Sequence, residues 1–200
     1  MLELLTGTGL ALSAGLNAYV PLLIMGIASR FLPFVELPAN WTWLENPWVL
    51  AILGVLLVIE VVADKIPAVD SINDWVQTLV RPTAGGLAFG SGTSMETAAV
   101  TDPTQFFESN WVPFVTGAVI ALVVHLTKAI ARPAANALTM GAAAPVLSTV
   151  EDASSVGLAI AAIVVPILIL VAVPLLIWWG VRSVRKARAS VAARKHEKSS

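Results

Sequence analysis

The 200-residue chain contains no cysteine and only two histidines. The absence of cysteine excludes disulfide bonds, thiolate metal sites and thiol catalysis. Because one of the two histidines lies in the C-terminal tail, a histidine-rich metal site is not expected either. We therefore expect neither a metal ion nor a cofactor.

Enzyme motifs are also missing from the chain. The glycines at 85–92 lack the Lys-Ser/Thr pair of a nucleotide-binding loop, and neither Gly-x-Ser-x-Gly nor His-Glu-x-x-His occurs. Paired carboxylates alone are weak evidence for catalysis. No catalytic residue is assigned from the sequence.

Charged residues are scarce, at 12% of the chain, whereas 57% of the residues are hydrophobic. So apolar a composition indicates a membrane protein. The charge is distributed unevenly, because Lys and Arg dominate residues 182–200 while residues 1–181 are acidic overall. We expect the basic segment to be a disordered cytoplasmic tail that binds anionic lipids, and we expect no nucleic-acid partner.

Several apolar segments predict helices that cross a bilayer. The strongest are residues 7–31, 48–63, 111–130 and 156–179, with tryptophans at the borders of three of them. Two weaker segments, 83–100 and 134–150, are rich in small residues. If both cross, this all-α integral membrane protein has six transmembrane helices; if both are re-entrant hairpins, it has four full spans.

The distribution of basic residues favours the six-span version. In that version Lys65, Arg81, Lys128, Arg132 and the tail lie on one side, with only Arg30 opposite, which satisfies the positive-inside rule. We expect residues 1–181 to form one transmembrane domain, with both termini cytoplasmic.

Repetition within the chain supports this plan. Residues 45–65 match residues 108–128 at a constant offset of 63. Arg81-Pro82 and Arg132-Pro133 each place a positive charge and a helix-starting proline before a run of small residues. The pattern predicts internal repeats whose two Arg-Pro segments meet in space, with the arginines facing nearby acids.

Residues 67–81 have the spacing of an amphipathic helix on the cytoplasmic face. Its acids Asp70 and Asp74 lie one turn apart and, with Asp64, would form an acidic entrance for a cation or a proton relay. The alternative is a solvated connector whose acids face water.

Other polar residues lie within apolar segments. Glu60 shares a helix face with Asp64, so the two carboxylates form a proton-carrying pair, unless Glu60 pairs with Lys65 or reaches the interface. Asn17 and Asn136, with Thr139 near the second, would bond across helices or contact a substrate. Arg81 and Arg132 would bind a phosphate, unless they only set the topology.

Four pieces of the chain resemble a known family. They are Gly15-Leu16-Asn17-Ala18-Tyr19-Val20-Pro21, Asp64-Lys65-Ile66-Pro67-x-x-Asp70, Arg81-Pro82-x-x-Gly85, and Arg132-Pro133-x-x-Asn136-x-x-Thr139 followed by Glu151-Asp152. Together they look like the bacterial membrane family called domain of unknown function 4126, over roughly residues 5 to 180. The resemblance implies a multi-span protein of the bacterial inner membrane and no established activity.

These observations favour a small membrane transport protein that moves a solute, an ion or a lipid headgroup. Its pathway would be lined by the two Arg-Pro segments, and a chain this small would act as a homodimer. A phospholipid or polyprenyl-phosphate flippase is an alternative of the same kind. A membrane-embedded lipid-modifying enzyme and a non-catalytic assembly factor are alternatives of other classes.

Overall fold

The computed structural model describes residues 2–37, 39–93, 103–140 and 143–172, and also residues 174, 175, 177, 178, 181, 182 and 185. The described chain is helical and contains no strand. The predicted tail, residues 182–200, falls almost entirely outside the described residues. So does the side chain of Asp70, although its backbone is part of a helix.

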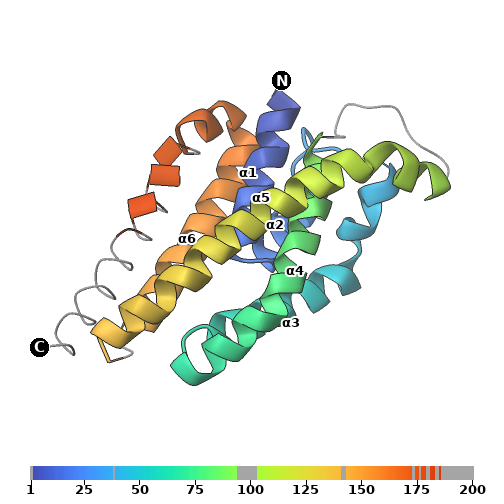
Figure 1. Cartoon of the computed structure of the whole chain (residues 1–200). Coiled ribbons are helices and arrows are strands. Elements are labelled where there is room, and N and C mark those ends of the chain that lie inside the picture. The colour runs from blue at the N-terminus through green and yellow to red at the C-terminus, as the bar shows by residue number, and fades with distance from the viewer. Residues whose placement is uncertain are drawn as a thin grey trace, which may run out of the picture.

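The described chain begins with the short helices α1 (Leu2–Leu16) and α2 (Tyr19–Phe31). A 3-10 helix, η1 (Ala39–Glu45), leads into α3 (Pro47–Ala63) and α4 (Pro67–Thr93). The long α5 (Pro103–Leu138), α6 (Ala143–Val164) and the 3-10 turn η2 (Pro166–Leu168) follow. Helix α1 packs against α4, α5 and α6, and α4 and α5 run side by side (Figure 1).

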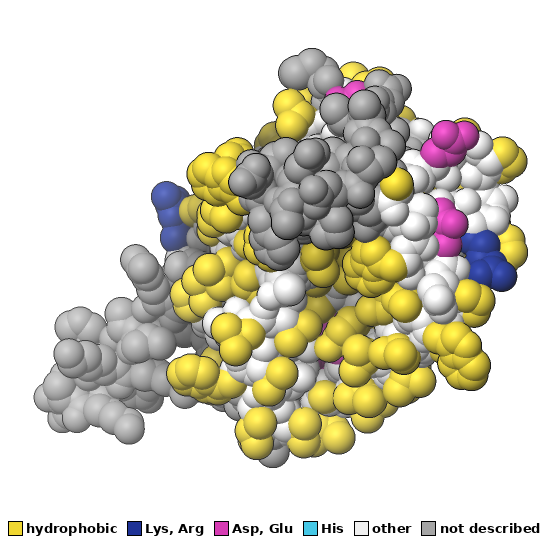
Figure 2. All heavy atoms as spheres, turned by 90° about the vertical axis from the view of Figure 1, so that its right-hand side faces the viewer, with side chains coloured by type: hydrophobic (Ala, Val, Ile, Leu, Met, Phe, Trp, Pro, Cys, Tyr) yellow, Lys and Arg dark blue, Asp and Glu magenta, His cyan; other side chains and the backbone are white. Residues whose placement is uncertain are grey.

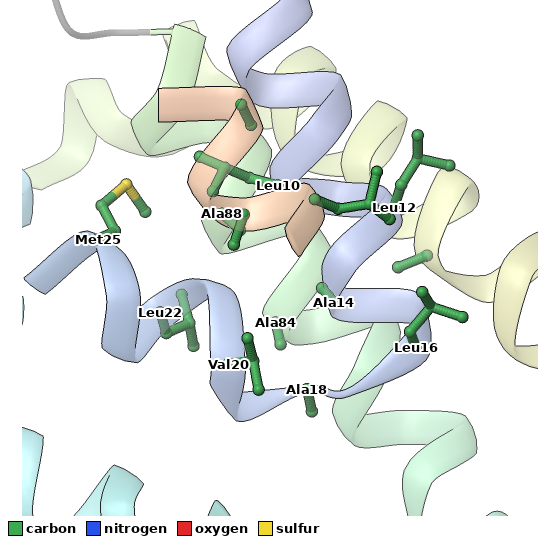
Figure 3. Packing of buried hydrophobic residues seen from close by; sticks show 14 of the residues in the cluster. Leu10, Leu12, Ala14, Leu16, Ala18, Val20, Leu22, Met25, Ala84 and Ala88 are labelled. Carbon is green, nitrogen blue, oxygen red and sulfur yellow. The ribbon is translucent and has the colours of Figure 1, made fainter. Parts of the chain in front are cut away.

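The first apolar segment, residues 7–31, is not the single helix that its hydropathy predicts. Helix α1 ends at Leu16, and the Asn17 side-chain oxygen accepts hydrogen bonds from the backbone amides of Tyr19 (3.1 Å) and Val20 (3.3 Å). These bonds satisfy the first amides of α2 and start a new helix. Asn17 and Ala18 are fully buried, and α1 and α2 diverge from this turn inside the molecule (Figure 3).

Helix α3 matches the predicted segment 48–63, whereas the boundaries around the two small-residue segments differ from the prediction. Helix α4 joins the amphipathic segment 67–81 to the small residues after it and continues to Thr93, while residues 94–100 lie outside the described residues. Helix α5 passes through Pro133 and ends at Leu138, so the segment 134–150 is divided between α5 and α6. Pro82 and Pro133 therefore lie within helices and do not start them. The proline ring removes one backbone hydrogen bond, and packing against neighbouring helices keeps both helices continuous.

The last apolar segment, residues 156–179, is interrupted as well. Helix α6 ends at Val164, and Pro166 begins a 3-10 turn. A residue that precedes proline is pushed out of the helical conformation, which explains the non-helical backbone of Val165. Among the described helices, residues 111–137 of α5 and 143–164 of α6 are long and apolar enough to cross a membrane.

Small residues allow α1, α4 and α5 to approach closely. A Cβ atom added at Gly15 would lie 2.6 Å from the Cβ of Val124 and 2.7 Å from the carbonyl oxygen of Ala121. One added at Gly85 would also collide with Ala121 and with the carbonyl oxygen of Gly117. Around this contact lies a core of leucine and alanine side chains (Figure 3). The small residues after Arg81 thus serve helix packing.

The exterior of the bundle is strongly apolar. Trp48, Ile52, Val55 and Ile59 of α3 and Trp75 of α4 are all exposed. Figure 2 shows hydrophobic side chains across much of one face, with few charged side chains on it. Isolated exposed hydrophobic residues are normal in soluble proteins, but so continuous an apolar surface needs an apolar environment or a partner.

The predicted internal repeat is not supported by the fold. Residues 48 and 111 correspond at the offset of 63. However, Trp48 lies at the start of α3, whereas Trp111 lies well inside α5. The paired lysines differ too, since Lys65 is half-exposed and Lys128 is buried. Similar apolar sequences here occupy unlike environments.

Candidate functional site

The turn between α1 and α2 is the first component of a buried polar site. Arg81 on α4 donates from Nη1 to the carbonyl oxygen of Gly15 at 3.1 Å, and Lys128 on α5 donates from Nζ to that of Leu16 at 3.2 Å. These carbonyls end α1, where the helix dipole is negative. Two cations from different helices therefore satisfy the end of a helix that stops inside the protein.

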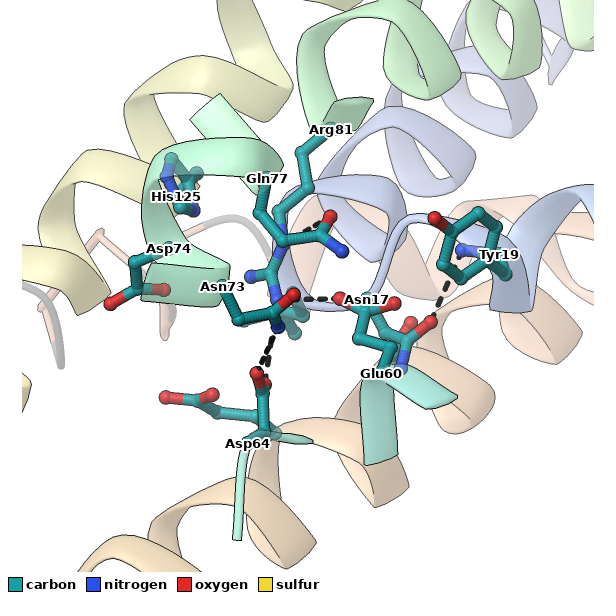
Figure 4. Close-up of polar contacts among 12 residues, drawn as sticks. Asn17, Tyr19, Glu60, Asp64, Asn73, Asp74, Gln77, Arg81 and His125 are labelled. Atoms are coloured by element: carbon teal, nitrogen blue, oxygen red, sulfur yellow. Dashed lines mark hydrogen bonds and ion pairs between the residues drawn. The ribbon is translucent and has the colours of Figure 1, made fainter. Parts of the chain in front are cut away.

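Asp64, which follows the last residue of α3, lies among three cations. Its Oδ2 atom is 3.1 Å from Nη2 of Arg132, 3.5 Å from Nη2 of Arg81 and 3.7 Å from Nζ of Lys128. Its Oδ1 atom accepts a hydrogen bond from Asn73 Nδ2 at 2.7 Å (Figure 4). One carboxylate oxygen thus occupies the centre of a site that favours negative charge.

Two further acids flank the three cations. Glu60 on α3 accepts from Arg81 Nη2 at 2.6 Å. Glu151 on α6 accepts from Lys128 Nζ at 3.1 Å and binds both the Nε and the Nη2 groups of Arg132. The paired contacts of Arg132 and Glu151 have the fork geometry that makes guanidinium–carboxylate pairs strong.

The resulting ionic cluster has equal numbers of positive and negative groups. It consists of Arg81, Lys128, Arg132, Glu60, Asp64 and Glu151. All six residues are at most 4% exposed. Removal of so many charges from water is tolerated only because each group has opposite partners.

Asp64 in the cluster and Asp74 near it have opposite pKa shifts. Burial alone would raise the pKa of Asp64, but Lys128, Arg132 and Arg81 outweigh it and hold the pKa below its ordinary value of 3.8. Burial raises the pKa of Asp74 on α4, and the same cations are too weakly coupled to offset it. Asp74 Oδ1 is buried and has no hydrogen-bond partner among the described residues.

A rim of polar residues closes one side of the ionic cluster. The Asn17 side-chain amide donates to Asp152 Oδ1 at 3.0 Å, and Lys65 Nζ lies 3.8 Å from Asp152 Oδ2. Lys65 is 37% exposed and Asp152 is 20% exposed, so this pair lies between the buried cluster and the surface. Asn17 therefore both starts α2 and ties it to α6.

Some of the site residues predicted from the sequence lie in the ionic cluster, and others do not. The structure brings Asp64, Glu60, Arg81 and Arg132 into the ionic cluster and places Asn17 at its edge. Thr139 is exposed instead. Its hydroxyl oxygen accepts a hydrogen bond from the backbone N–H of Ala143, the first residue of α6, at 3.0 Å. Asn136 is half-buried, and its Oδ1 has no partner among the described residues.

Sequence reasoning missed three residues at or beside the ionic cluster. Lys128 was used only to predict topology, Glu151 only as part of the family resemblance, and His125 was not singled out. A signal was present, because His125, Lys128 and Arg132 follow the three- and four-residue spacing of one helix face. Only the fold could show that this face meets Asp64 and Glu151.

Burial of the basic residues also changes the topology argument. Arg81, Lys128 and Arg132 bind acids inside the protein and are not free to mark the cytoplasmic side. Of the four residues that the six-span prediction places on the cytoplasmic side, only Lys65 is half-exposed. Orientation in a membrane therefore stays a prediction.

The fold and the cluster define an all-helical protein with an apolar exterior and a buried ionic centre. No group of His, Asp or Glu side chains within the described ranges is placed to hold a metal ion. The chain belongs to the family described as Domain of unknown function (DUF4126), which matches residues 4–186. No curated protein and no solved structure matches the chain.

Proposed function

We propose that this protein is an integral membrane transport protein whose ionic cluster binds a small anionic solute through a carboxylate or phosphate group. The observation that carries the proposal is the convergence of three cations on one oxygen of Asp64. Asp64 would act as an internal substitute for the solute, holding the cations in place while the site is empty and giving them up when the anion binds.

The exterior supports a membrane setting. Helices α5 and α6 contain segments that are long and apolar enough to cross a membrane, and the exposed face of α3 is apolar. With Trp111 at one interface, Lys128 would lie about 25 Å along α5, near the opposite side of the hydrocarbon layer. The cluster would then be reached from that side, past Lys65 and Asp152.

The interrupted first segment supports transport in particular. Helices α1 and α2 are each too short to cross a bilayer, and their junction is buried beside the cations. Discontinuous helices in transporters expose backbone groups at the substrate site. Here the carbonyls of Gly15 and Leu16 hold Arg81 and Lys128, so movement of α1 against α2 would move both cations.

Full burial of the cluster favours a free solute over a lipid headgroup. A headgroup carries acyl chains that must remain in the membrane, whereas Arg81 and Arg132 face the interior between helices. A free anion and a lipid headgroup would present the same charged group to the cluster, so an experiment has to distinguish between them.

The test uses the full-length protein in liposomes loaded with radiolabelled sulfate, phosphate or succinate. We expect faster efflux than from protein-free vesicles, slower efflux with Arg132→Lys because its fork is lost, and unchanged efflux with Lys65→Arg. A fluorescent phospholipid in the same vesicles should not change leaflets faster. Efflux of all three anions at the protein-free rate would contradict the proposal. The cluster would then serve only to stabilise the fold.

A further inference from the structure

A histidine adjoins the ionic cluster without belonging to it. His125 on α5 is fully buried, one turn from Lys128, and its Nε2 atom lies 3.0 Å from the hydroxyl oxygen of Thr78 on α4. Its other ring nitrogen, Nδ1, is buried and has no hydrogen-bond partner among the described residues. The anion-binding proposal gives this histidine no role.

The hydrogen bonds of Thr78 assign the tautomer of the ring. The Thr78 hydroxyl lies 2.8 Å from the backbone carbonyl oxygen of Asp74, which can only accept a hydrogen bond. A hydroxyl has one proton, so Thr78 donates it to that carbonyl and accepts from Nε2–H of His125. Nδ1 is then left with an unprotonated lone pair that is available as a base.

The charged groups near His125 come from four helices. Arg81 on α4 and Lys128 and Arg132 on α5 act electrostatically on the ring, and Asp74 on α4 meets the ring through its backbone. Glu60 and Asp64 from α3 and Glu151 from α6 lie across the three cations and pair with them. A fourth positive charge would add to a cluster that is already balanced.

We propose that the binding of each anion is coupled to the uptake of one proton from solution by Nδ1 of His125. The inference rests on the anion site proposed above and names its coupling ion. An added anion leaves the balanced cluster with excess negative charge, and protonation of His125 offsets one unit of that charge. By linkage, the anion promotes protonation and the proton strengthens anion binding to the same degree. Departure of the anion returns the proton to solution.

Sulfate is a suitable probe, because it does not itself titrate near neutral pH. Its affinity for the full-length protein in detergent micelles is measured by calorimetry between pH 5.5 and 7.5. We expect the affinity to rise as the pH falls, by up to about tenfold per unit for one linked proton. Titrations in buffers with different ionisation enthalpies should show net proton uptake with the sulfate.

Three variants locate the proton. His125→Gln keeps an N–H for Thr78 but has no base, so it should bind sulfate with an affinity independent of pH. His196→Gln, which removes the only other histidine, and Asp74→Asn should retain the pH dependence. The proton count of the wild-type protein provides a test even if His125→Gln does not fold.

The outcomes separate the two proposals. Sulfate binding without pH dependence or proton uptake would overturn the coupling and leave the anion site standing. Loss of the pH dependence in Asp74→Asn but not in His125→Gln would overturn the assignment to His125. Absence of sulfate binding at every pH would overturn the anion site, and the coupling with it.

Discussion

Arg132 and Asp64 are 68 residues apart in the chain, yet Nη2 of the first donates to Oδ2 of the second at 3.1 Å in the interior of the protein. The contact joins α5 to the end of α3. Because Arg81 and Lys128 also approach the same oxygen, Asp64 holds together cations from two helices. Loss of this one carboxylate would leave three cations facing two acids.

The ionic cluster makes single neutralising substitutions costly. Arg81→Gln leaves Glu60 buried and uncompensated, which should lower the free energy of unfolding by about 3–5 kcal/mol. The double variant Glu60→Gln/Arg81→Gln keeps the cluster neutral and should lose less than the sum of the two single variants. Unfolding in mixed micelles of detergent and SDS measures the coupling between the two positions. Additive losses would show that the pair does not act as a unit.

The close approach of α4 and α5 gives a prediction with an internal control. Gly85→Ala places a methyl group against Ala121 and the carbonyl oxygen of Gly117, and should lower the free energy of unfolding by about 1–3 kcal/mol. Gly54→Ala on α3 meets nothing within 4 Å and should be neutral or raise it by up to about 1 kcal/mol, because alanine favours the helix. Equal effects at the two positions would contradict the close packing of α4 and α5.

The two aspartates predict opposite responses to pH. The pKa of Asp64 is lowered in the folded protein, so its stabilising contribution is full above pH 3.8 and is lost as the pH falls through the folded-state pKa. The pKa of Asp74 is raised, so its charged form disfavours folding at neutral pH. At pH 7, Asp64→Asn should therefore reduce the thermal stability in micelles, and Asp74→Asn should not. A similar loss in both variants would contradict these opposite shifts.

Sequence patterns predicted the helical fold and several members of the site, but not their arrangement. Apolar runs and Arg-Pro spacing indicated helices and drew attention to Arg81, Arg132 and Asp64. The break at Asn17 was missed, because hydropathy averages over one polar residue whose side chain starts a new helix. The role of Glu151 was missed because its partners on α5 are set by how α5 and α6 pack, which no local pattern specifies.

The most direct test of the anion site compares sulfate binding by wild-type protein, Asp64→Asn and Asp152→Asn, measured by calorimetry in micelles at one pH. Asp64→Asn removes the internal competitor for the three cations, and charge-assisted hydrogen bonds are worth about 1.5–3 kcal/mol, so we predict at least about tenfold tighter binding. Asp152→Asn changes an acid of the rim that binds Asn17 and Lys65, and should bind like the wild-type protein. Unchanged or weaker binding by Asp64→Asn would contradict the claim that this carboxylate occupies the place of the transported anion.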